Sequence, residues 1–408
     1  MNVVVTGVGV VSAFGSGLAA LEDGLRAHRV ATRSGPLNEA LAVPCVAEVP
    51  DGPTGPDRRN DFAVSAVREC LASAASPATP PDSTPDSTPG GAPGPVALAA
   101  HDAILIGCGV ERAMLPAFDP LWDGTGVDFE RAAGAAPPHL LRGRVDAPVR
   151  AVCDVLGHEG PAFASSNACA GGVIALLRAA RWVRSGRAER VLCGATDSMI
   201  DPMGLGGMLR LGTLSATGVC RPFDVRRDGL VMGEGAAMFL VESERSARAR
   251  GATVWAHVLA GGVTQDAYRP SAPHPEGRYA EAAMRAALRD HDACSVDYVN
   301  AHGTGTPLND VAEAQAIRRA VGEAVPVSSI KGAIGHAMAA SGAIEIAACL
   351  LALREGFLPG TAGLEAVDRD IGPLNLVHAP REAPLRRVLC NAFGFGGQNA
   401  SVLLGRAR

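Results

Sequence analysis

A cysteine, two histidines and a lysine lie among small residues, and together they could carry out acyl transfer. The cysteine, Cys169, follows an apolar segment and precedes Ala170, Gly171 and Gly172. A helix is expected to start there, and the positive end of its dipole should lower the pKa of the thiol. Small neighbours would let a substrate reach the sulfur. We therefore predict that Cys169 is a nucleophile, whereas the other cysteines are expected to be inert and mostly buried.

Lys331 is the only lysine of the chain, and every other cation except histidine is an arginine. A compact ammonium kept at one position indicates a chemical requirement that a planar guanidinium does not meet. His336 follows five residues later in the run Ser-Ser-Ile-Lys-Gly-Ala-Ile-Gly-His over 328–336. The histidine and the glycines beside it favour an active-site lysine over a surface lysine.

The second histidine, His302, ends a predicted strand and opens a loop, His-Gly-Thr-Gly-Thr-Pro-Leu-Asn-Asp, over 302–310. A histidine followed by glycines and threonines is expected to face a cavity rather than to be packed in a core. Glu313 lies three residues after Asp310, on the same face of the helix that is expected to begin there. These residues form a second candidate part of the site.

A glycine-rich loop reads Asn-Ala-Phe-Gly-Phe-Gly-Gly-Gln-Asn over 391–399. Its glycines would weaken a plain strand. Backbone N–H groups near Gly394 and Phe395 could stabilise an oxyanion, with a phenylalanine as an apolar lid. A phosphate-binding loop is the alternative interpretation, but the Gly-Lys-Ser/Thr ending of such loops is missing.

The second histidine narrows the chemistry. A cysteine hydrolase needs one imidazole and a group that orients it. Two imidazoles at glycine-rich turns suit decarboxylation, because both N–H groups can stabilise the enolate that forms on a thioester carbonyl. The residues therefore predict a thiol acyltransferase that also decarboxylates.

The elements that must position these residues form two similar series. Arg-Val-Leu-Cys-Gly-Ala at 190–195 returns as Arg-Val-Leu-Cys-Asn-Ala at 387–392. Each strand follows a helix rich in Ala, Leu and Ile, one beginning after Cys169 and the other after His336. We predict two duplicated α/β halves, over 1–245 and 246–408, with Cys169 and His336 at corresponding helix starts.

Composition limits the remaining choices. A net charge of −5 and a pI near 6.1 provide no general basic surface for nucleic acid or an anionic membrane. No apolar run is long enough to span a membrane and no signal peptide is recognised, so a cytoplasmic location is expected. A Pro/Ser/Thr-rich segment at about 73–95, with a tandem Pro-Asp-Ser-Thr, is predicted to be a disordered insertion within the first half.

The ordered set of motifs resembles the β-ketoacyl-acyl carrier protein synthases of the condensing-enzyme family. The resemblance includes the opening Val-Thr-Gly-Val-Gly-Val-Val-Ser, the elbow at Cys169, the segment 221–235, and the motifs at His302, Lys331/His336 and 394–397. It covers nearly the whole chain and implies the α/β thiolase-like fold, in which two duplicated halves pack in αβαβα layers. The sequence of the loop at 302–310 is more typical of polyketide and specialised-metabolism synthases than of fatty-acid elongation enzymes.

The resemblance also implies roles for individual residues. Cys169 would take an acyl chain, and a malonyl thioester would then lose CO2 and attack the acyl-Cys. His302 and His336 would bind the thioester carbonyl, while Lys331 and Glu313 hold the local network. The backbone N–H groups of Cys169 and Phe395 would form the oxyanion hole, with Phe395 also as a gate. Contacts with the pantetheine arm are expected at Thr304, Thr306 and Ser271.

No metal, redox group or other bound cofactor is implied, because phosphopantetheine arrives on an acyl carrier protein. No carrier or reductase segment follows the condensing unit, so separate partners are expected. Arg58, Arg59 and Arg210 are candidates for a cationic rim that meets an acidic carrier. The chain would form a homodimer, or a heterodimer with a subunit like a chain-length factor.

Three other functions stay open or less favoured. The chain could pass its acyl group to an alcohol or amine, or it could be a non-condensing subunit of a ketosynthase heterodimer. The two histidines disfavour the first function, and Cys169 disfavours the second. A biosynthetic thiolase would need a second catalytic cysteine near the C-terminal loop, where Cys390 is instead expected to be buried in a strand.

Overall fold

The computed structural model describes residues 1–34, 38, 41–50, 52–53, 57–75, 96–110 and 143–407, and the structural statements below concern these residues. They contain a 12-stranded mixed sheet with the order β11-β9-β8-β13-β14-β7-β1-β6-β5-β3-β4, and β2 pairs with β1. The strands of this sheet are β1 (Val3–Ser12), β2 (Gly15–Ser16), β3 (Ala103–Cys108), β4 (Ala162–Ser165), β5 (Arg190–Ser198), β6 (Glu234–Ser243), β7 (Ala256–Gln265), β8 (Tyr298–Asn300), β9 (Pro326–Ser328), β11 (Asn375–Leu376), β13 (Arg387–Gly394) and β14 (Gln398–Arg406). A separate pair consists of β10 (Phe357–Leu358) and β12 (Arg381–Glu382).

The sheet has an internal repeat. Inward from β4 at one edge, the first half runs β4-β3-β5-β6-β1. Inward from β9, the second half runs β9-β8-β13-β14-β7, and β11 lies outside β9 at the other edge. Each series begins with two parallel pairings and continues with two antiparallel pairings. The halves join where β1 and β7 pair antiparallel. The predicted duplication is therefore confirmed by strand order and by strand direction.

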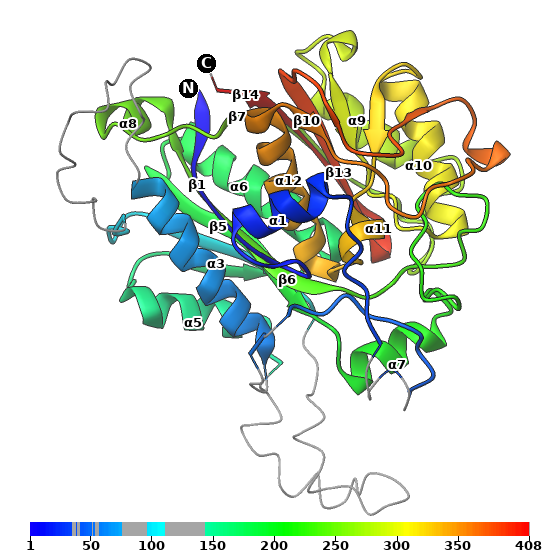
Figure 1. Cartoon of the computed structure of the whole chain (residues 1–408). Coiled ribbons are helices and arrows are strands. Elements are labelled where there is room, and N and C mark those ends of the chain that lie inside the picture. Colours follow the sequence, from blue (N-terminus) through cyan, green and yellow to red (C-terminus); the bar gives the residue numbers. More distant parts are fainter. Residues whose placement is uncertain are drawn as a thin grey trace, which may run out of the picture.

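Helices cover both half-sheets and fill the space between them (Figure 1). Helices α6 and α12 contact strands of both halves, whereas α3 and α5 cover the first half-sheet and α9 covers the second, with α10 packed against α9. The result is the predicted αβαβα layering. The helices are α1 (Leu18–Arg26), α3 (Arg58–Ala75), α5 (Ala147–Leu156), α6 (Gly171–Arg184), α7 (Pro202–Arg210), α8 (Glu244–Ala249), α9 (Arg278–Ala287), α10 (Pro307–Ala320), α11 (Lys331–Ile334) and α12 (Ser341–Glu355).

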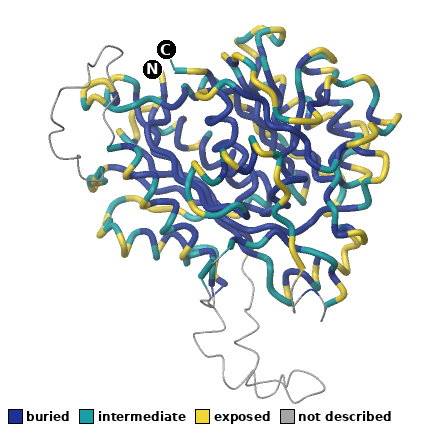
Figure 2. The backbone as a smooth tube through the Cα atoms, in the orientation of Figure 1, coloured by how far each residue is buried: buried dark blue, intermediate teal, exposed yellow. Residues whose placement is uncertain are grey.

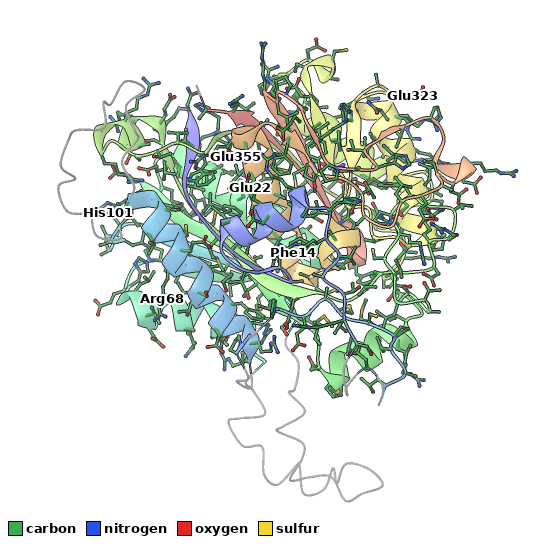
Figure 3. All side chains as sticks on the ribbon, in the orientation of Figure 1. Phe14, Glu22, Arg68, His101, Glu323 and Glu355 are labelled. Atoms are coloured by element: carbon green, nitrogen blue, oxygen red, sulfur yellow. The ribbon has the colours of Figure 1, made fainter. Side chains whose placement is uncertain are left out.

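Burial follows these layers (Figure 2). Helix α12 is buried from Ser341 to Leu353 because its side chains meet a neighbour on every side. Figure 3 shows Glu355 where α12 reaches the surface and Arg68 on the outer side of α3. A helix that is apolar all round is the sequence signature of such a central position.

The glycines of β1 allow a helix to lie close to the sheet. β1 runs without interruption from Val3 to Ser12. A Cβ atom at Gly9 would lie 2.0 Å from the carbonyl oxygen of Ala66 in α3. Glycine is therefore needed for the close approach of α3 to the sheet.

Two boundary predictions fare differently. The insertion predicted at about 73–95 starts too early, because residues 73–75 form the last turn of α3, and the remaining residues 76–95 lie outside the described ones. The proposed division between residues 245 and 246 falls inside α8 and stays a prediction.

The repeat also corrects the expected match of Cys169 with His336. A short 3-10 helix, η4 (Ala168–Ala170), precedes α6, and its counterpart η6 (Met338–Ala340) precedes α12. Ala168 and Met338 share an unusual positive φ, of 45° and 47°. Cys169 therefore corresponds to Ala339, and His336 lies three residues before that position.

The remaining bulk predictions concern thiols and membranes. All ten cysteines are free, and seven of them are buried. Cys390 is buried within β13, as predicted. Among the described residues, no helix has the length and apolar character needed to cross a bilayer.

Candidate active site

A strained turn presents Cys169 between the half-sheets. Strand β4 ends at Ser165, and the chain turns through Ala168, whose φ of 45° is costly for any residue with a Cβ atom. Cys169 follows in η4 with 2 % of its surface exposed, immediately before α6. The small side chains around this turn allow the backbone to bend sharply.

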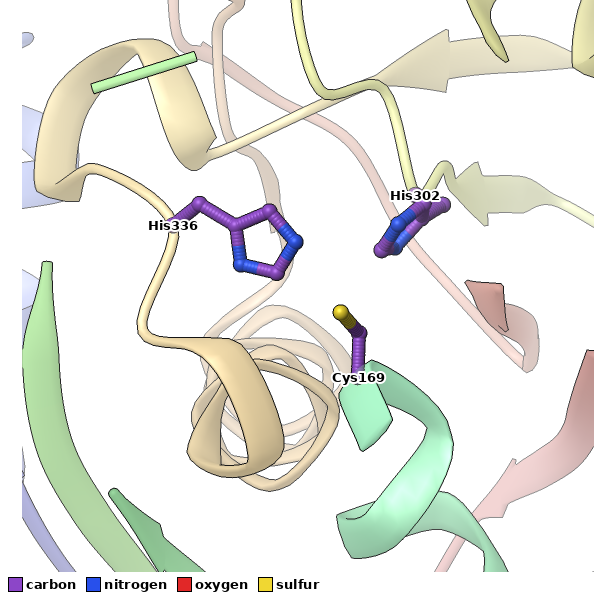
Figure 4. Close-up of side chains that lie close together, drawn as sticks. All are labelled: Cys169, His302 and His336. Atoms are coloured by element: carbon purple, nitrogen blue, oxygen red, sulfur yellow. The ribbon is translucent and has the colours of Figure 1, made fainter. Parts of the chain in front are cut away.

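The two predicted histidines meet this sulfur from the second half of the chain (Figure 4). Cys169 Sγ and one ring nitrogen of each of His302 and His336 lie within 4.8 Å of one another. The rings of His302 and His336 are 5.4 Å apart and nearly perpendicular, at 85°. The sequence therefore placed three distant residues correctly in one cluster.

Hydrogen bonds assign the proton of each imidazole. Nδ1 of His336 accepts a hydrogen bond from the Met338 backbone N–H at 3.0 Å, and Nδ1 of His302 lies 3.3 Å from the Lys331 ammonium. Because both partners are donors, each Nδ1 is the unprotonated nitrogen and each Nε2 carries the hydrogen. Two Nε2–H donors therefore face the space beside the sulfur.

This assignment also bears on metal binding. A cysteine and two histidines within 4.8 Å have the composition of a zinc site. Histidines that bind a metal usually donate their second ring N–H to an acceptor. In this cluster the second nitrogens of His302 and His336 accept instead, so the nitrogens that face the sulfur hold protons and do not fit a metal ion.

Lys331 is fully buried, and its ammonium is held by two partners. Its ammonium donates to the His302 carbonyl oxygen at 2.6 Å and forms a salt bridge with Glu345 of α12. Glu313 instead accepts hydrogen bonds from the backbone N–H groups of His302 and Gly303, at 2.8 and 2.7 Å. Glu313 thus holds the His302 loop, and Glu345 balances the lysine.

The sequence contained a signal for Glu345 that pattern reading missed. Glu345 stands between Ile344 and Ile346 in the most apolar helix of the chain, and a carboxylate in such a helix needs a cationic partner. With a single buried lysine available, that partner is Lys331.

The Glu345 and Lys331 pair leads to a stability prediction. Replacing Glu345 with glutamine is expected to lower the free energy of unfolding by about 3 to 5 kcal/mol, because the buried ammonium loses its counter-charge. The matched control is the double change Lys331→Met with Glu345→Leu, which removes both charges and should cost less. Urea unfolding measures both variants. Equal losses in the two variants would contradict the assigned ion pair.

Electrostatics keep the resting cluster neutral. Burial raises the pKa of the Cys169 thiol to about 12, and Lys331 and the Phe395 backbone N–H only partly oppose this shift. The expectation of a lowered thiol pKa is therefore wrong, because burial disfavours the thiolate more than the nearby ammonium and N–H favour it. Burial and Lys331 hold the pKa values of His302 and His336 well below their usual range.

The raised thiol pKa predicts how Cys169 reacts with an alkylating reagent. Since the thiolate is the nucleophile, the alkylation rate with iodoacetamide should rise about tenfold per pH unit between about pH 7 and about pH 10, with no plateau. Peptide mass spectrometry over a time course gives this rate, and exposed Cys294 in the same sample reports on the reagent. A plateau below about pH 8 would contradict the prediction.

The glycine-rich loop lies against the elbow. Short helix η8 (Phe395–Gly397) places the Phe395 backbone N–H as a hydrogen-bond donor to Cys169, and the Phe395 ring packs in the same apolar cluster. A Cβ atom at Gly394 would lie 3.0 Å from the backbone nitrogen of Cys169, which explains a glycine there. Asn167 also donates to Gln398 at 2.8 Å, so elbow and loop are joined.

The predicted substrate-contact residues lie at different depths. Thr304 is buried, and its hydroxyl lies 2.8 Å from that of half-buried Thr306. Ser271 is exposed and has no recorded contact with either threonine, but its neighbour Pro270 accepts a hydrogen bond from the Gly396 backbone N–H at 2.7 Å. Thr304 and Thr306 therefore lie in the loop at 302–310, whereas Ser271 lies beside the loop at 391–399, and the three residues do not form one cluster.

Two of the three predicted rim arginines are unsuitable. Arg59 is completely buried and its guanidinium binds Asp57. Arg58 is largely covered and pairs with Glu48 and Glu234. Arg210, the last residue of α7, is exposed and stays a candidate.

The duplicated layers and the thiol with two imidazoles define a thiolase-like acyltransferase. The family model for the N-terminal domain of β-ketoacyl synthases matches residues 149–247, and the model for the C-terminal domain matches residues 255–365. The chain therefore belongs to the β-ketoacyl synthase family and is a condensing enzyme.

Individual relatives agree with this assignment. The tetracenomycin polyketide synthase ketoacyl synthase alpha subunit of Streptomyces glaucescens is 33% identical, over 100% of this chain and 97% of the relative. The 3-oxoacyl-[acyl-carrier-protein] synthase 2 of Mycobacterium tuberculosis is 37% identical, over 59% of this chain and 60% of the relative. Among solved structures, the ishigamide ketosynthase/chain length factor has a TM-score of 0.83 at 29% identity and covers 100% of this chain and 99% of its own.

Proposed function

We propose that the chain condenses an acyl group held on Cys169 with a malonyl group carried by an acyl carrier protein, in polyketide biosynthesis. The observation that carries this proposal is the pair of Nε2–H donors beside a buried thiol. The names of the Streptomyces relatives support polyketide synthesis over fatty-acid synthesis. In the proposed reaction, phosphopantetheine belongs to the carrier and is part of the substrate.

The first half-reaction is a thioester exchange. The Cys169 sulfur attacks the acyl carbonyl, the carbon–sulfur bond to the carrier breaks, and the proton lost by Cys169 ends on the carrier thiol. The Phe395 backbone N–H, which meets the sulfur in the resting enzyme, supports an oxyanion hole at this position together with the Cys169 backbone N–H. Because His302 and His336 are neutral in the resting enzyme, neither carries an extra proton that must leave before the Cys169 thiol reacts.

The second half-reaction uses both histidines. The malonyl carboxylate leaves as CO2, and the electron pair of the broken bond forms an enolate whose oxygen accepts from Nε2–H of His302 and His336. The carbanion then attacks the acyl carbonyl on Cys169 and expels the thiolate, which takes up one proton. Lys331 keeps His302 in the required tautomer through Nδ1. The products are a β-ketoacyl carrier, a free carrier and CO2.

The sheet edge supports a dimer. Strand β4, which leads to Cys169, is the outermost strand of the first half-sheet, and its Phe163 is 45% exposed. An open edge with an exposed aromatic side chain is a favourable surface for pairing with a second subunit. We place at this edge the contact with a second copy or with a chain-length-factor-like subunit. Mass photometry of the purified chain, alone and with such a subunit, distinguishes the two.

Intact-protein mass spectrometry tests the proposed function. The enzyme is mixed with acyl-carrier protein and then with malonyl-carrier protein. The expected result is an acyl adduct on Cys169, followed by a carrier whose mass corresponds to the β-keto product after loss of CO2. An adduct that moves only to an added alcohol or amine would instead support the alternative acyltransferase. The absence of any adduct, with or without a partner subunit, would reject the proposal.

A further inference from the structure

A serine hydroxyl contacts His336 from the start of the central helix. Ser341 is the first residue of α12, only 2% of its surface is exposed, and its Oγ lies 2.8 Å from Nδ1 of His336. The same Nδ1 accepts from the Met338 backbone N–H at 3.0 Å. Two groups therefore meet the nitrogen on the far side of the ring from the Cys169 sulfur.

The backbone N–H settles the direction of the serine bond. An amide N–H can only donate, so a proton on Nδ1 would face the amide hydrogen of Met338. Nδ1 is consequently an acceptor, and the Ser341 hydroxyl must donate to it. No capping hydrogen bond is made by a side chain at the start of α12, and the hydroxyl bond recorded for Ser341 is the one to His336.

We propose that Ser341 is a positioning residue that, together with the Met338 backbone N–H, holds His336 as a neutral Nε2–H donor for decarboxylation. The inference rests on the proposed function, because it assigns to Ser341 an effect on one half-reaction. Ser341 touches neither the sulfur nor the place of the substrate. It acts through the imidazole.

The internal repeat separates this role from a general need of the fold. The helix start that corresponds to Ser341 in the first half is Gly171, which begins α6 after η4. The same backbone path therefore forms without a hydroxyl at this position. The serine occurs in the half where a histidine lies five residues before it.

The surroundings of His336 otherwise contain several titratable groups. Cys169 and His302 share its cluster, and Lys331 is the charge that lowers its pKa. Farther out, Glu345 pairs with Lys331, Glu313 binds the backbone of His302, and Asp197 accepts from the Ala339 backbone N–H. None of these groups donates to Nδ1 of His336 in the recorded hydrogen bonds.

Loss of the hydroxyl has a defined consequence for one half-reaction. Ser341→Ala leaves the Met338 backbone N–H as the remaining donor to Nδ1 of His336, so the ring and its Nε2–H tautomer are held less firmly. The rate of malonyl-carrier decarboxylation at neutral pH should fall about three- to tenfold, whereas acylation of Cys169 changes less than about twofold.

The experiment compares three variants of the full chain. Ser341→Ala is tested beside Ser341→Thr, which keeps a hydroxyl and should restore the wild-type decarboxylation rate. Ser198→Ala is the matched control, since it removes a buried hydroxyl that binds Glu234 at 2.6 Å and no histidine. Thermal unfolding verifies that each variant is folded. Rates of decarboxylation and of Cys169 acylation are measured separately at neutral pH.

A second measurement does not depend on activity. In protein labelled with 15N-histidine, the Nδ1 signal of His336 should be that of an unprotonated acceptor, and Ser341→Ala should shift it toward a less hydrogen-bonded value. An unchanged decarboxylation rate together with an unchanged Nδ1 signal would overturn the inference. A wild-type enzyme that neither acylates nor decarboxylates would overturn the proposed function, while the Nδ1 signal would still decide the tautomer.

Discussion

Replacing Cys169 with alanine is expected to abolish condensation, with a fall of at least about 10⁴-fold in the rate of β-keto product formation, because the acyl acceptor is lost. Decarboxylation of malonyl carrier should survive in this variant. The enolate oxygen is bound by His302 and His336, and neither ring depends on the sulfur for its tautomer. Mass spectrometry of the carrier should show acetyl carrier accumulating without a β-keto product.

Two controls make the Cys169→Ala result specific. Cys193→Ala removes an equally buried thiol of β5 and should leave condensation unchanged. Acylation is monitored in parallel, and no adduct should form on the Cys169→Ala protein. If that variant still forms the β-keto product at more than a trace rate, Cys169 is not the nucleophile.

His302→Ala and His336→Ala are expected to have the reverse effect of Cys169→Ala: decarboxylation is slowed more than acylation. Removing one donor to the enolate oxygen should slow decarboxylation about 10²- to 10³-fold. Acylation of Cys169 should stay within about tenfold of wild type, since the Phe395 backbone N–H and the elbow are intact. Single-turnover measurements with acyl carrier alone and malonyl carrier alone separate the two half-reactions.

Combining the His302 and His336 substitutions in one protein tests whether the two imidazoles act on the same oxygen. If both imidazoles bind one oxygen, the double variant should lose less than the product of the two single losses. Glutamine provides a second substitution, because its amide keeps an N–H donor near the same place. A histidine variant that blocks acylation and decarboxylation equally would argue for general disruption of the cluster and against the assigned division of labour.

Sequence reasoning located the residues of the Cys169, His302 and His336 cluster because each carried a chemical signature that does not depend on packing. Cys169, His302 and His336 stand at the ends of apolar segments beside glycines, and the end of a strand is where a side chain meets a cavity. The duplicated halves were also visible, since the repeated strand at 190–195 and 387–392 belongs to β5 and β13, which occupy equivalent positions in the sheet.

The errors have a common origin in three-dimensional packing. The pairing of Glu345 with Lys331 was not predicted, because it depends on how α12 lies, which periodicity does not specify. The direction of the Cys169 pKa shift depends on burial, which outweighs the local helix start. Arg59 was expected at the surface, but Asp57 allows a complete guanidinium to be buried. A single sequence therefore does not determine which residue pairs with each buried charged side chain.

The placement of the only lysine has a chemical consequence for a protein that handles thioesters. Activated thioesters acylate free amines without a catalyst, and the product amide is not reversed by thiol exchange. Lys331 is 1% exposed and its ammonium is engaged by Glu345 and the His302 carbonyl oxygen, while every other lysine or arginine of the chain is an arginine. Since a guanidinium stays protonated, the surface offers thioesters no side-chain amine. Uncatalysed acylation by a thioester therefore has no exposed lysine to modify on this chain.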